Sequence, residues 1–269
     1  MDYVKFLEYV LTESSKIAAS QFGKVKGWAK DGDNQTVLTE TDIEIGTFIV
    51  KSIEKEFPHD NILHEEAGGI NKNSNMTWVA DPIDGTSNFA AGVPMYGIMV
   101  GLLEGGTPIA GGFALPSFSE IYVAQKRRGA TCNGKSIHVT DETDLSKLLV
   151  AYGIHAKTPN HSKVQGEIVK SLIPRVLNIR SSASTFDMAM VAKGTYGAFI
   201  SSRGRIWDCV APHIVIEEAG GTFTHFDGRT IDYSDPLKNA SRQFSYAMGN
   251  ETALKELTSV VAAKQKDLA

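Results

Sequence analysis

The chain has 269 residues, a length that suits one large domain or two closely packed ones. Hydrophobic residues make up 42% and charged residues 22%, so a packed core is expected rather than disorder. The formal net charge of −4 provides no general basic excess for a nucleic-acid backbone, and no apolar run reaches the ~20 residues of a transmembrane helix. We therefore expect neither a nucleic-acid partner nor a membrane partner.

The N-terminal segment, residues 1–21, does not resemble a signal peptide, because acidic residues such as Asp2 and Glu8 interrupt its apolar positions. This composition favours a cytoplasmic location. The two cysteines, Cys132 and Cys209, lie far apart and form no metal-binding or redox motif. Free thiols are therefore expected.

The first part of the chain is predicted to combine two helices with a β-meander. Apolar residues at helical spacing predict helices over 3–22 and 41–57, and the polar stretch 30–35 between them indicates a loop or hairpin turn. The strands predicted to follow are 76–80, 97–103, 107–115 and 120–124, and Asn133-Gly134-Lys135 marks a further hairpin.

After about residue 146 the pattern changes to alternating strands and helices. A meander followed by such alternation predicts an α/β layered fold in two halves, 1–145 and 146–269, which form one compact catalytic unit. The predicted strands are 148–152, 176–179, 197–200, 222–224 and 245–248, and the predicted helices are 161–173, 185–193, 209–219 and 251–263.

The most informative segment, residues 78–89, reads W-V-A-D-P-I-D-G-T-S-N-F. A hydrophobic strand runs into Asp81, Pro82 is expected to end the regular ladder because it lacks an N–H, and Asp84 follows across a tight bend. Two carboxylates at a strand end can share hard cations such as Mg²⁺, and the carbonyl of Ile83 would add a neutral ligand. A lone D-x-x-D usually caps a turn, but the surrounding strand and turn residues favour a functional site.

The residues that follow are suited to an anion. Gly85 lets the backbone approach a ligand closely, and Thr86 and Ser87 are good helix N-caps. Backbone N–H groups of these three residues, at the start of a short helix, would bind a phosphate. Metal and anion would then lie side by side, as phosphoryl transfer requires.

Three further acidic segments are candidates for the same site, although each has a simpler interpretation. Glu65 and Glu66 stand in a glycine-bounded loop, where paired glutamates are usually a solvated surface. Asp208 opens an apolar helix, and Asp42 opens the second predicted helix, so helix capping would be a sufficient role for either.

Together these motifs resemble those of the inositol monophosphatase family, within the wider lithium-sensitive, metal-dependent phosphatases. Residues 81–89 match the family's D-P-I-D-G-T-x-N-F signature, and residues 207–221 match its W-D-x-x-A signature with the apolar helix and E-A-G-G that follow. Residues 65–66 are similar to its G-E-E motif, and residues 41–42 to its T-x-T-D segment. The resemblance spans nearly the whole chain in the family's order.

The resemblance implies a fold of the α/β class, the five-layer α-β-α-β-α sandwich of the sugar phosphatases. It also implies a Mg²⁺-dependent, lithium-inhibited phosphoric monoester hydrolase that forms a homodimer. The implied substrate is a small phosphorylated polyol or sugar, most simply myo-inositol 1-phosphate.

The family's metal ligands map onto five positions. The resemblance implies that Glu65, Asp81 and the Ile83 carbonyl bind one Mg²⁺ ion, and that Asp81, Asp84 and Asp208 bind a second. It allows a third, weaker ion near Glu65, a residue that would also help to hold the attacking water.

The same resemblance assigns the phosphate and the water. Gly85, Thr86 and Ser87 would bind the phosphate beside Asp84, and Thr86, with Asp42 behind it, would orient or deprotonate the attacking water.

The sequence also departs from the family pattern. His64 replaces a usual glycine, and the loop at 30–37 is spaced differently from the family's K-x-x-x-D-x-V-T form. Animal members carry a glutamate that contacts the inositol hydroxyls seven residues before the second-signature aspartate, where this chain has Ser201. Arg203 or Arg205 could instead face a more acidic substrate, such as a bisphosphate, although surface solvation is the simpler role.

Two alternative functions follow. Within the family, fructose 1,6-bisphosphate and histidinol phosphate remain open as substrates, whereas Ile83 and Asn88 argue against the nucleotide-directed members. From another class, the chain could be a non-catalytic regulatory partner that keeps the fold. Retention of all four metal carboxylates, Glu65, Asp81, Asp84 and Asp208, argues against that reading.

Overall fold

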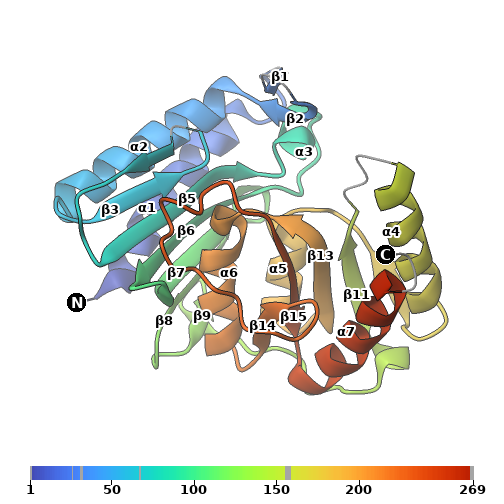
Figure 1. Cartoon of the computed structure of the whole chain (residues 1–269). Coiled ribbons are helices and arrows are strands. Elements are labelled where there is room, and N and C mark those ends of the chain that lie inside the picture. Colours follow the sequence, from blue (N-terminus) through green and yellow to red (C-terminus); the bar gives the residue numbers. More distant parts are fainter. Residues whose placement is uncertain (1, 26, 31–32, 67, 155–158, 267–269) are drawn as a thin grey trace.

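The computed structural model describes residues 2–25, 27–30, 33–66, 68–154 and 159–266, and its elements form five layers (Figure 1). The five-layer sandwich expected from the sequence is confirmed. Among the described helices, none is both long and apolar enough to cross a bilayer. The layers are, in order, helices α1 (Tyr3–Gln21) and α2 (Glu40–Glu56), a first sheet, helices α5 (Thr185–Ala192) and α6 (Ile206–Glu218), a second sheet, and helices α4 (Pro159–Leu172) and α7 (Glu251–Lys266).

In the described residues the first sheet has eight strands, in the order β10-β9-β8-β7-β6-β5-β3-β4. Strands β3 and β5 run parallel, and the other neighbouring pairs are antiparallel. The strands are β3 (Asn61–His64), β4 (Gly68–Ile70), β5 (Met76–Asp84), β6 (Gly97–Glu104), β7 (Thr107–Leu115), β8 (Glu120–Gln125), β9 (Ala130–Cys132) and β10 (Lys135–Ser136).

The described part of the second sheet has five strands, in the order β12-β11-β13-β15-β14. Strand β11 is parallel to both of its neighbours, and β15 is antiparallel to both of its own. The strands are β11 (Leu149–Gly153), β12 (Asn178–Arg180), β13 (Ala198–Gly204), β14 (Thr222–His225) and β15 (Phe244–Gly249).

A two-stranded hairpin and a short helix accompany the first sheet. Strands β1 (Trp28–Lys30) and β2 (Asp33–Leu38) pair antiparallel, as expected for the predicted hairpin, although residues 31–32 of its turn lie outside the described residues. The short helix α3 (Thr86–Ala90) follows β5 directly.

Alternate residues of β5 enter two different cores. Trp78 packs in the cluster beneath α1 and α2, with Leu7 and Ile45, whereas Val79 belongs to the cluster between the two sheets, with Val210 of α6. A strand buried on both faces reads as a continuous hydrophobic run, because successive side chains point in opposite directions. A third cluster fills the space between the second sheet and the outer helices α4 and α7.

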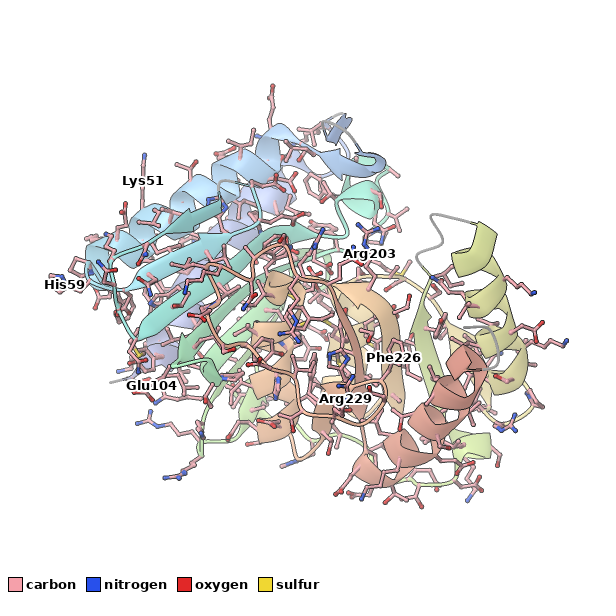
Figure 2. All side chains as sticks on the ribbon, in the orientation of Figure 1. Lys51, His59, Glu104, Arg203, Phe226 and Arg229 are labelled. Carbon is pink, nitrogen blue, oxygen red and sulfur yellow. The ribbon has the colours of Figure 1, made fainter. Side chains whose placement is uncertain are left out.

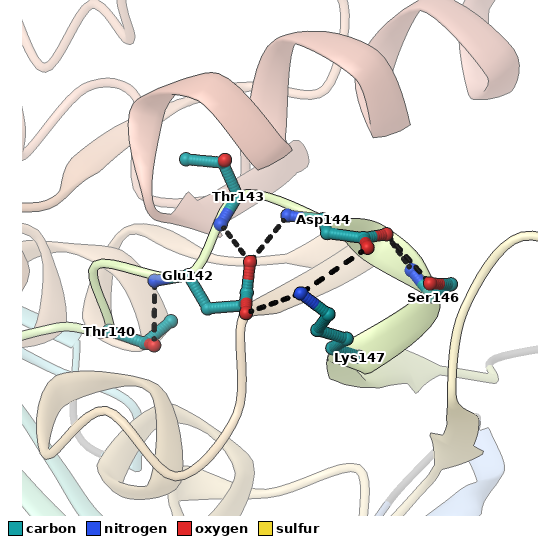
Figure 3. A network of polar contacts seen from close by, with 6 residues as sticks. All are labelled: Thr140, Glu142, Thr143, Asp144, Ser146 and Lys147. Atoms are coloured by element: carbon teal, nitrogen blue, oxygen red, sulfur yellow. Dashed lines mark hydrogen bonds and ion pairs between the residues drawn. The ribbon is translucent and has the colours of Figure 1, made fainter.

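The crossover from the first sheet to the second is held by its own polar groups (Figure 3). Glu142 accepts hydrogen bonds from the backbone N–H groups of Thr143 and Asp144, at 3.0 and 2.9 Å. Lys147 Nζ lies 3.5 Å from Glu142 Oε2 and 3.7 Å from Asp144 Oδ2. The chain passes from the first sheet to the second through this segment, near the predicted boundary at residue 145. The division into two halves stays a prediction.

The structure corrects several predicted boundaries. Strand β5 extends four residues beyond the predicted end and passes through Pro82, and α6 begins at Ile206 rather than at residue 209. Strands β3 and β4 were not predicted; they are only four and three residues long. The free thiols expected for Cys132 and Cys209 are confirmed.

Candidate active site

The end of β5 carries two of the predicted metal carboxylates. Its pairing with β6 is regular up to Asp81, opposite Met99, and resumes at Asp84, opposite Gly97, after a register shift. The ladder therefore continues past Pro82 instead of ending there. Residues three apart on a regular strand point to opposite faces, but an irregular stretch redirects the side chains. Asp81 and Asp84 consequently reach the same place.

The third carboxylate comes from the start of α6. Asp208 lies in the first helical turn, where its Oδ2 accepts a hydrogen bond from the Arg205 N–H at 2.6 Å. Asp208 therefore does cap α6, but it does so from the first turn of the helix rather than from the N-cap position. The same side chain brings a carboxylate oxygen within 4.8 Å of those of Asp81 and Asp84. We call these three residues the carboxylate cluster.

The carboxylate cluster is electrostatically unfavourable on its own. Burial, and then the charges of Glu65, Asp84 and Asp208, raise the pKa of Asp81 well above its usual value. Burial is also the main cause that raises the pKa of Asp84 to about 6 and that of Asp208 to about 8. Like charges in a poorly solvated site disfavour the ionised forms. A divalent cation would remove this repulsion.

The donor set fits such a cation. Asp81 is 2% exposed, and its buried Oδ1 has no hydrogen-bond partner among the described residues. A buried polar atom without a partner in the protein is costly unless a bound ion or ligand satisfies it. Oxygen-only ligands at a strand end are the donors that Mg²⁺ prefers. The residues present therefore fit the predicted magnesium site.

Glu65 lies beside the cluster, just after β3, the strand that pairs with β5. Its N–H donates to the Ala80 carbonyl of β5 at 3.3 Å, which places it next to Asp81. Its charge contributes to the raised pKa of Asp81. The neighbouring His64 is buried, its Nδ1 accepts from the Glu66 N–H at 3.3 Å, and burial lowers its pKa. His64 therefore supports the loop as a neutral group rather than as a charge.

The predicted water-activating pair is also brought together. Thr86 Oγ1 lies 2.8 Å from the Ile83 carbonyl oxygen and 3.3 Å from Asp42 Oδ1. The other Asp42 oxygen accepts from the N–H and the hydroxyl of Thr39, at 2.8 and 2.5 Å, which caps α2. Asp42 thus fills both of the roles considered for it. A hydroxyl has one proton, so Thr86 donates to Ile83 or to Asp42, not to both at once.

The predicted phosphate-binding residues form the turn into α3. Gly85 is the N-cap and has φ +79°, a left-handed conformation that glycine adopts without strain. Thr86 and Ser87 are the first residues of the helix, so the prediction that their side chains cap it is wrong. As first-turn residues, however, they have N–H groups without an acceptor inside the helix. The N–H groups predicted to bind phosphate are therefore still available for that role.

Residues 182–185 also contact residues of the site. The N–H and the hydroxyl of Thr185 both donate to Asp84 Oδ2. Asn88, in the first signature, donates from Nδ2 to the Ser182 carbonyl at 3.1 Å. These contacts join segments about a hundred positions apart, so no local pattern in the sequence could reveal them.

Ser201, one of the departures from the family pattern, lies on β13 with Arg203, and Arg205 is the N-cap residue of α6. Ser201 is fully buried, and its hydroxyl donates to the Arg203 carbonyl at 2.7 Å. The Arg205 guanidinium donates to the Ser241 carbonyl. Within the described residues, the Arg203 guanidinium has no hydrogen bond or ion pair, and it lies at the end of β13 on the side of the molecule where α3 lies (Figure 2).

A two-sheet layered fold with a cluster of buried and half-buried carboxylates and an aspartate-backed hydroxyl suits a metal-assisted hydrolase of phosphoric monoesters. The chain belongs to the inositol monophosphatase family, whose model matches residues 3–267. The family assigned from the sequence motifs is therefore confirmed, as is the assignment of the chain to the phosphoric monoester hydrolases.

The chain is also similar to individual named proteins. A fructose-1,6-bisphosphatase/inositol-1-monophosphatase of Aquifex aeolicus is 30% identical over 224 residues, which cover 82% of this chain and 85% of the relative. The solved IMPase of Thermotoga maritima is 27% identical, with a TM-score of 0.87 and full coverage of both chains. An IMPase/NADP phosphatase complexed with Mg²⁺ and phosphate has the same fold, with a TM-score of 0.81 at 21% identity over 95% of this chain and 93% of that one.

Proposed function

We propose that this chain hydrolyses small phosphate monoesters of polyols or sugars in the presence of Mg²⁺, with myo-inositol 1-phosphate as the first candidate substrate. The observation that carries the proposal is the carboxylate cluster, with three oxygens within 4.8 Å and an Asp81 Oδ1 that has no hydrogen-bond partner in the described part of the chain. The names of the relatives support the substrate class, and the Mg²⁺ and phosphate of the solved neighbour support the cofactor.

Two ions are proposed. Asp81, Asp84 and Asp208 would hold one, and Glu65, Asp81 and the Ile83 carbonyl would hold the other, with room for a third, weaker ion near Glu65. When bound, Mg²⁺ acts as a Lewis acid on phosphoryl oxygens and lowers the pKa of water. This contribution is needed because hydrolysis of a phosphate monoester requires on the order of 20 kcal/mol of barrier reduction. One general base accelerates a reaction by only ~10²–10⁴-fold.

The remaining chemistry belongs to this chain's own side chains. When the Ile83 carbonyl serves as a ligand, the Thr86 hydroxyl turns its proton to Asp42, 3.3 Å away. A lone pair of the hydroxyl would then accept a hydrogen bond from the attacking water. Glu65 would help to position the same water. The N–H groups of Gly85, Thr86 and Ser87 would hold the phosphate in line with that water.

A second candidate, a substrate with another anionic group, is favoured by one observation. Ser201 cannot replace the inositol-contacting glutamate, because its hydroxyl is buried and already bonded to the Arg203 carbonyl. The Arg203 guanidinium, unpaired within the described residues, is suited to a second phosphate such as that of fructose 1,6-bisphosphate. Histidinol phosphate, which carries a protonated amino group and no second phosphate, fits this arginine less well.

Phosphate release tests these proposals. The purified protein would be assayed with inositol 1-phosphate, fructose 1,6-bisphosphate and histidinol phosphate, with and without Mg²⁺, alongside Asp84→Asn. Mg²⁺-dependent release that Asp84→Asn abolishes is expected. Arg203→Ala should weaken the bisphosphate activity selectively if that substrate is used.

The same assay addresses the regulatory alternative and the expected lithium sensitivity. Absence of release from every substrate, together with absence of Mg²⁺ binding, would overturn the enzymatic proposal and favour a non-catalytic partner. Inhibition by Li⁺ is expected wherever release is observed. The homodimer, the cytoplasmic location and the two-half division remain predictions, and light scattering of the purified chain would test the first.

A further inference from the structure

One oxygen of Asp84 is held by a residue outside both family signatures. Thr185 is the first residue of α5, and it is fully buried. Its N–H and its hydroxyl both donate to Asp84 Oδ2, with the hydroxyl 2.5 Å from that oxygen. Any residue at this position could supply the N–H. Only serine or threonine could supply the second donor with a side chain short enough for this site.

The approach of Thr185 depends on the strand opposite Asp84. Gly97 is the cross-strand partner of Asp84 in the pairing of β5 with β6. A Cβ on Gly97 would lie 2.6 Å from Thr185 Cβ and 2.8 Å from its hydroxyl oxygen, closer than such atoms can approach. The missing side chain of Gly97 therefore makes the space that Thr185 occupies. The two positions form a matched pair around the Asp84 carboxylate.

The segment before Thr185 is fixed from two sides, so the threonine has little freedom to move away. Asp187 Oδ2 accepts from the N–H groups of Ser182 and Ala183, at 2.9 and 3.0 Å. Asn88 Nδ2 donates to the Ser182 carbonyl at 3.1 Å and to the Met95 carbonyl at 2.7 Å. Asn88 thus ties this segment to the residues around α3.

We propose that Thr185 is a positioning residue for Asp84: its hydroxyl holds Oδ2 and so directs Oδ1 toward the cation. The inference rests on the proposed function, because it takes Asp84 as a ligand of Mg²⁺. A carboxylate fixed by two donors on one oxygen presents the other without a further loss of rotamer freedom when the ion binds. Removing the hydroxyl leaves one donor and lets the carboxylate rotate.

A structural role is the competing explanation, and it makes a different prediction. Asp84 also satisfies the first N–H of α5, so the contact stabilises the start of this helix. If that were all, loss of the hydroxyl would lower the unfolding temperature and leave Mg²⁺ affinity unchanged. A positioning role instead predicts a change in Mg²⁺ affinity beyond any change in stability.

The test uses Thr185→Val, which keeps the shape and removes the hydroxyl, and Thr185→Ser, which keeps the hydroxyl. Mg²⁺ would be titrated into the metal-free full-length proteins by calorimetry, and unfolding temperatures would be measured alongside. Thr185→Val should raise the Kd for Mg²⁺ by about 10-fold, and Thr185→Ser should stay within about 2-fold of the wild type. Thr258→Val is the matched control, because it removes a buried hydroxyl that donates to Leu254 on α7.

The outcomes separate this proposal from the proposed function. An unchanged Kd in Thr185→Val, with phosphate release intact, overturns the positioning role alone. A raised Kd in Thr185→Val and not in Thr258→Val supports it, even if no tested substrate releases phosphate. A wild-type protein that does not bind Mg²⁺ overturns both. If Thr185→Val does not fold, a Kd for Thr185→Ser raised as much as 10-fold would also overturn the role, since the hydroxyl is retained.

Discussion

The molecule contains two groups of acidic side chains. Their residue types are alike, so only their surroundings in the structure tell them apart. The carboxylate cluster of Asp81, Asp84 and Asp208 is wholly or largely removed from solvent. In the crossover segment, whose polar contacts Figure 3 shows, Asp144 is exposed and Glu142 is half-buried. Burial raises the pKa of every member of the first group, whereas hydrogen bonds from nearby N–H and hydroxyl groups lower the pKa of both members of the second.

The difference lies in what surrounds each group. The crossover acids have Lys147 and several backbone N–H groups beside them, so their charges are compensated within the segment. The carboxylate cluster has mainly other carboxylates as charged neighbours. Self-compensation indicates a structural turn, and its absence in a buried group indicates a site completed by a ligand. Four predictions test this difference between the two groups.

The largest effect is expected for Asp81→Asn. Loss of the carboxylate shared by both proposed ions removes several kcal/mol of transition-state stabilisation, so Mg²⁺-dependent phosphate release should fall by about 10³-fold or more. The metal-free variant should be at least as stable as the wild type, because one member of a mutually repelling buried group is gone. Release rates and urea unfolding in EDTA measure the two quantities. A variant that is both fully active and less stable would contradict the assignment.

Thr86→Val should have the next largest effect. The substitution removes the hydroxyl that lies between Asp42 and Ile83 but touches none of the three cluster carboxylates. Loss of a group that orients water is expected to lower kcat by about 10²–10³-fold, with Mg²⁺ affinity within a few fold of the wild type. Steady-state kinetics and Mg²⁺ titration together test this. Equal losses in kcat and in Mg²⁺ affinity would place Thr86 in the metal site rather than beside the water.

The pH dependence of stability should have opposite signs in the two regions. The folded pKa values of Asp84 and Asp208, about 6 and about 8, exceed the usual 3.8. The folded metal-free protein therefore binds more protons than the unfolded chain between about pH 4 and pH 8. Each such group makes the free energy of unfolding fall as pH rises through this window, by at most about 1.4 kcal/mol per pH unit.

Urea unfolding in EDTA at pH 5, 6.5 and 8 would show this fall, and Asp208→Asn should remove the part of it between pH 6 and 8. Saturating Mg²⁺ should reverse the trend, because the ion binds the deprotonated carboxylates. A metal-free protein whose stability rises steadily from pH 5 to pH 8 would show that the cluster is ionised without a cation.

The sequence predicted these regions unequally, and particular residues explain why. The first signature places Asp81, Asp84 and Thr86 close together in the chain, so their proximity could be predicted. The start of α6 was misplaced because its N-cap residue is Arg205, which carries no cap signal, while Asp208 acts from within the helix. The contact of Thr185 with Asp84 spans 101 positions and depends on the space above Gly97, which only the paired strands reveal.

The smallest effect is expected for Glu142→Gln in the crossover. The amide oxygen can still accept from the N–H groups of Thr143 and Asp144, so only the interaction with Lys147 at 3.5 Å is lost. Because the folded pKa of Glu142 is below its usual value, its contribution to stability is present at neutral pH and is lost as pH falls, opposite to the cluster. Exposed ion pairs contribute little to stability and are screened by salt.

The unfolding midpoint of Glu142→Gln should therefore fall slightly at low ionic strength and match that of the wild type in 1 M NaCl, with phosphate release within 2-fold throughout. A loss of release comparable with that of Asp81→Asn would mean that the crossover acids belong to the site, and the distinction between compensated and uncompensated carboxylates would fail.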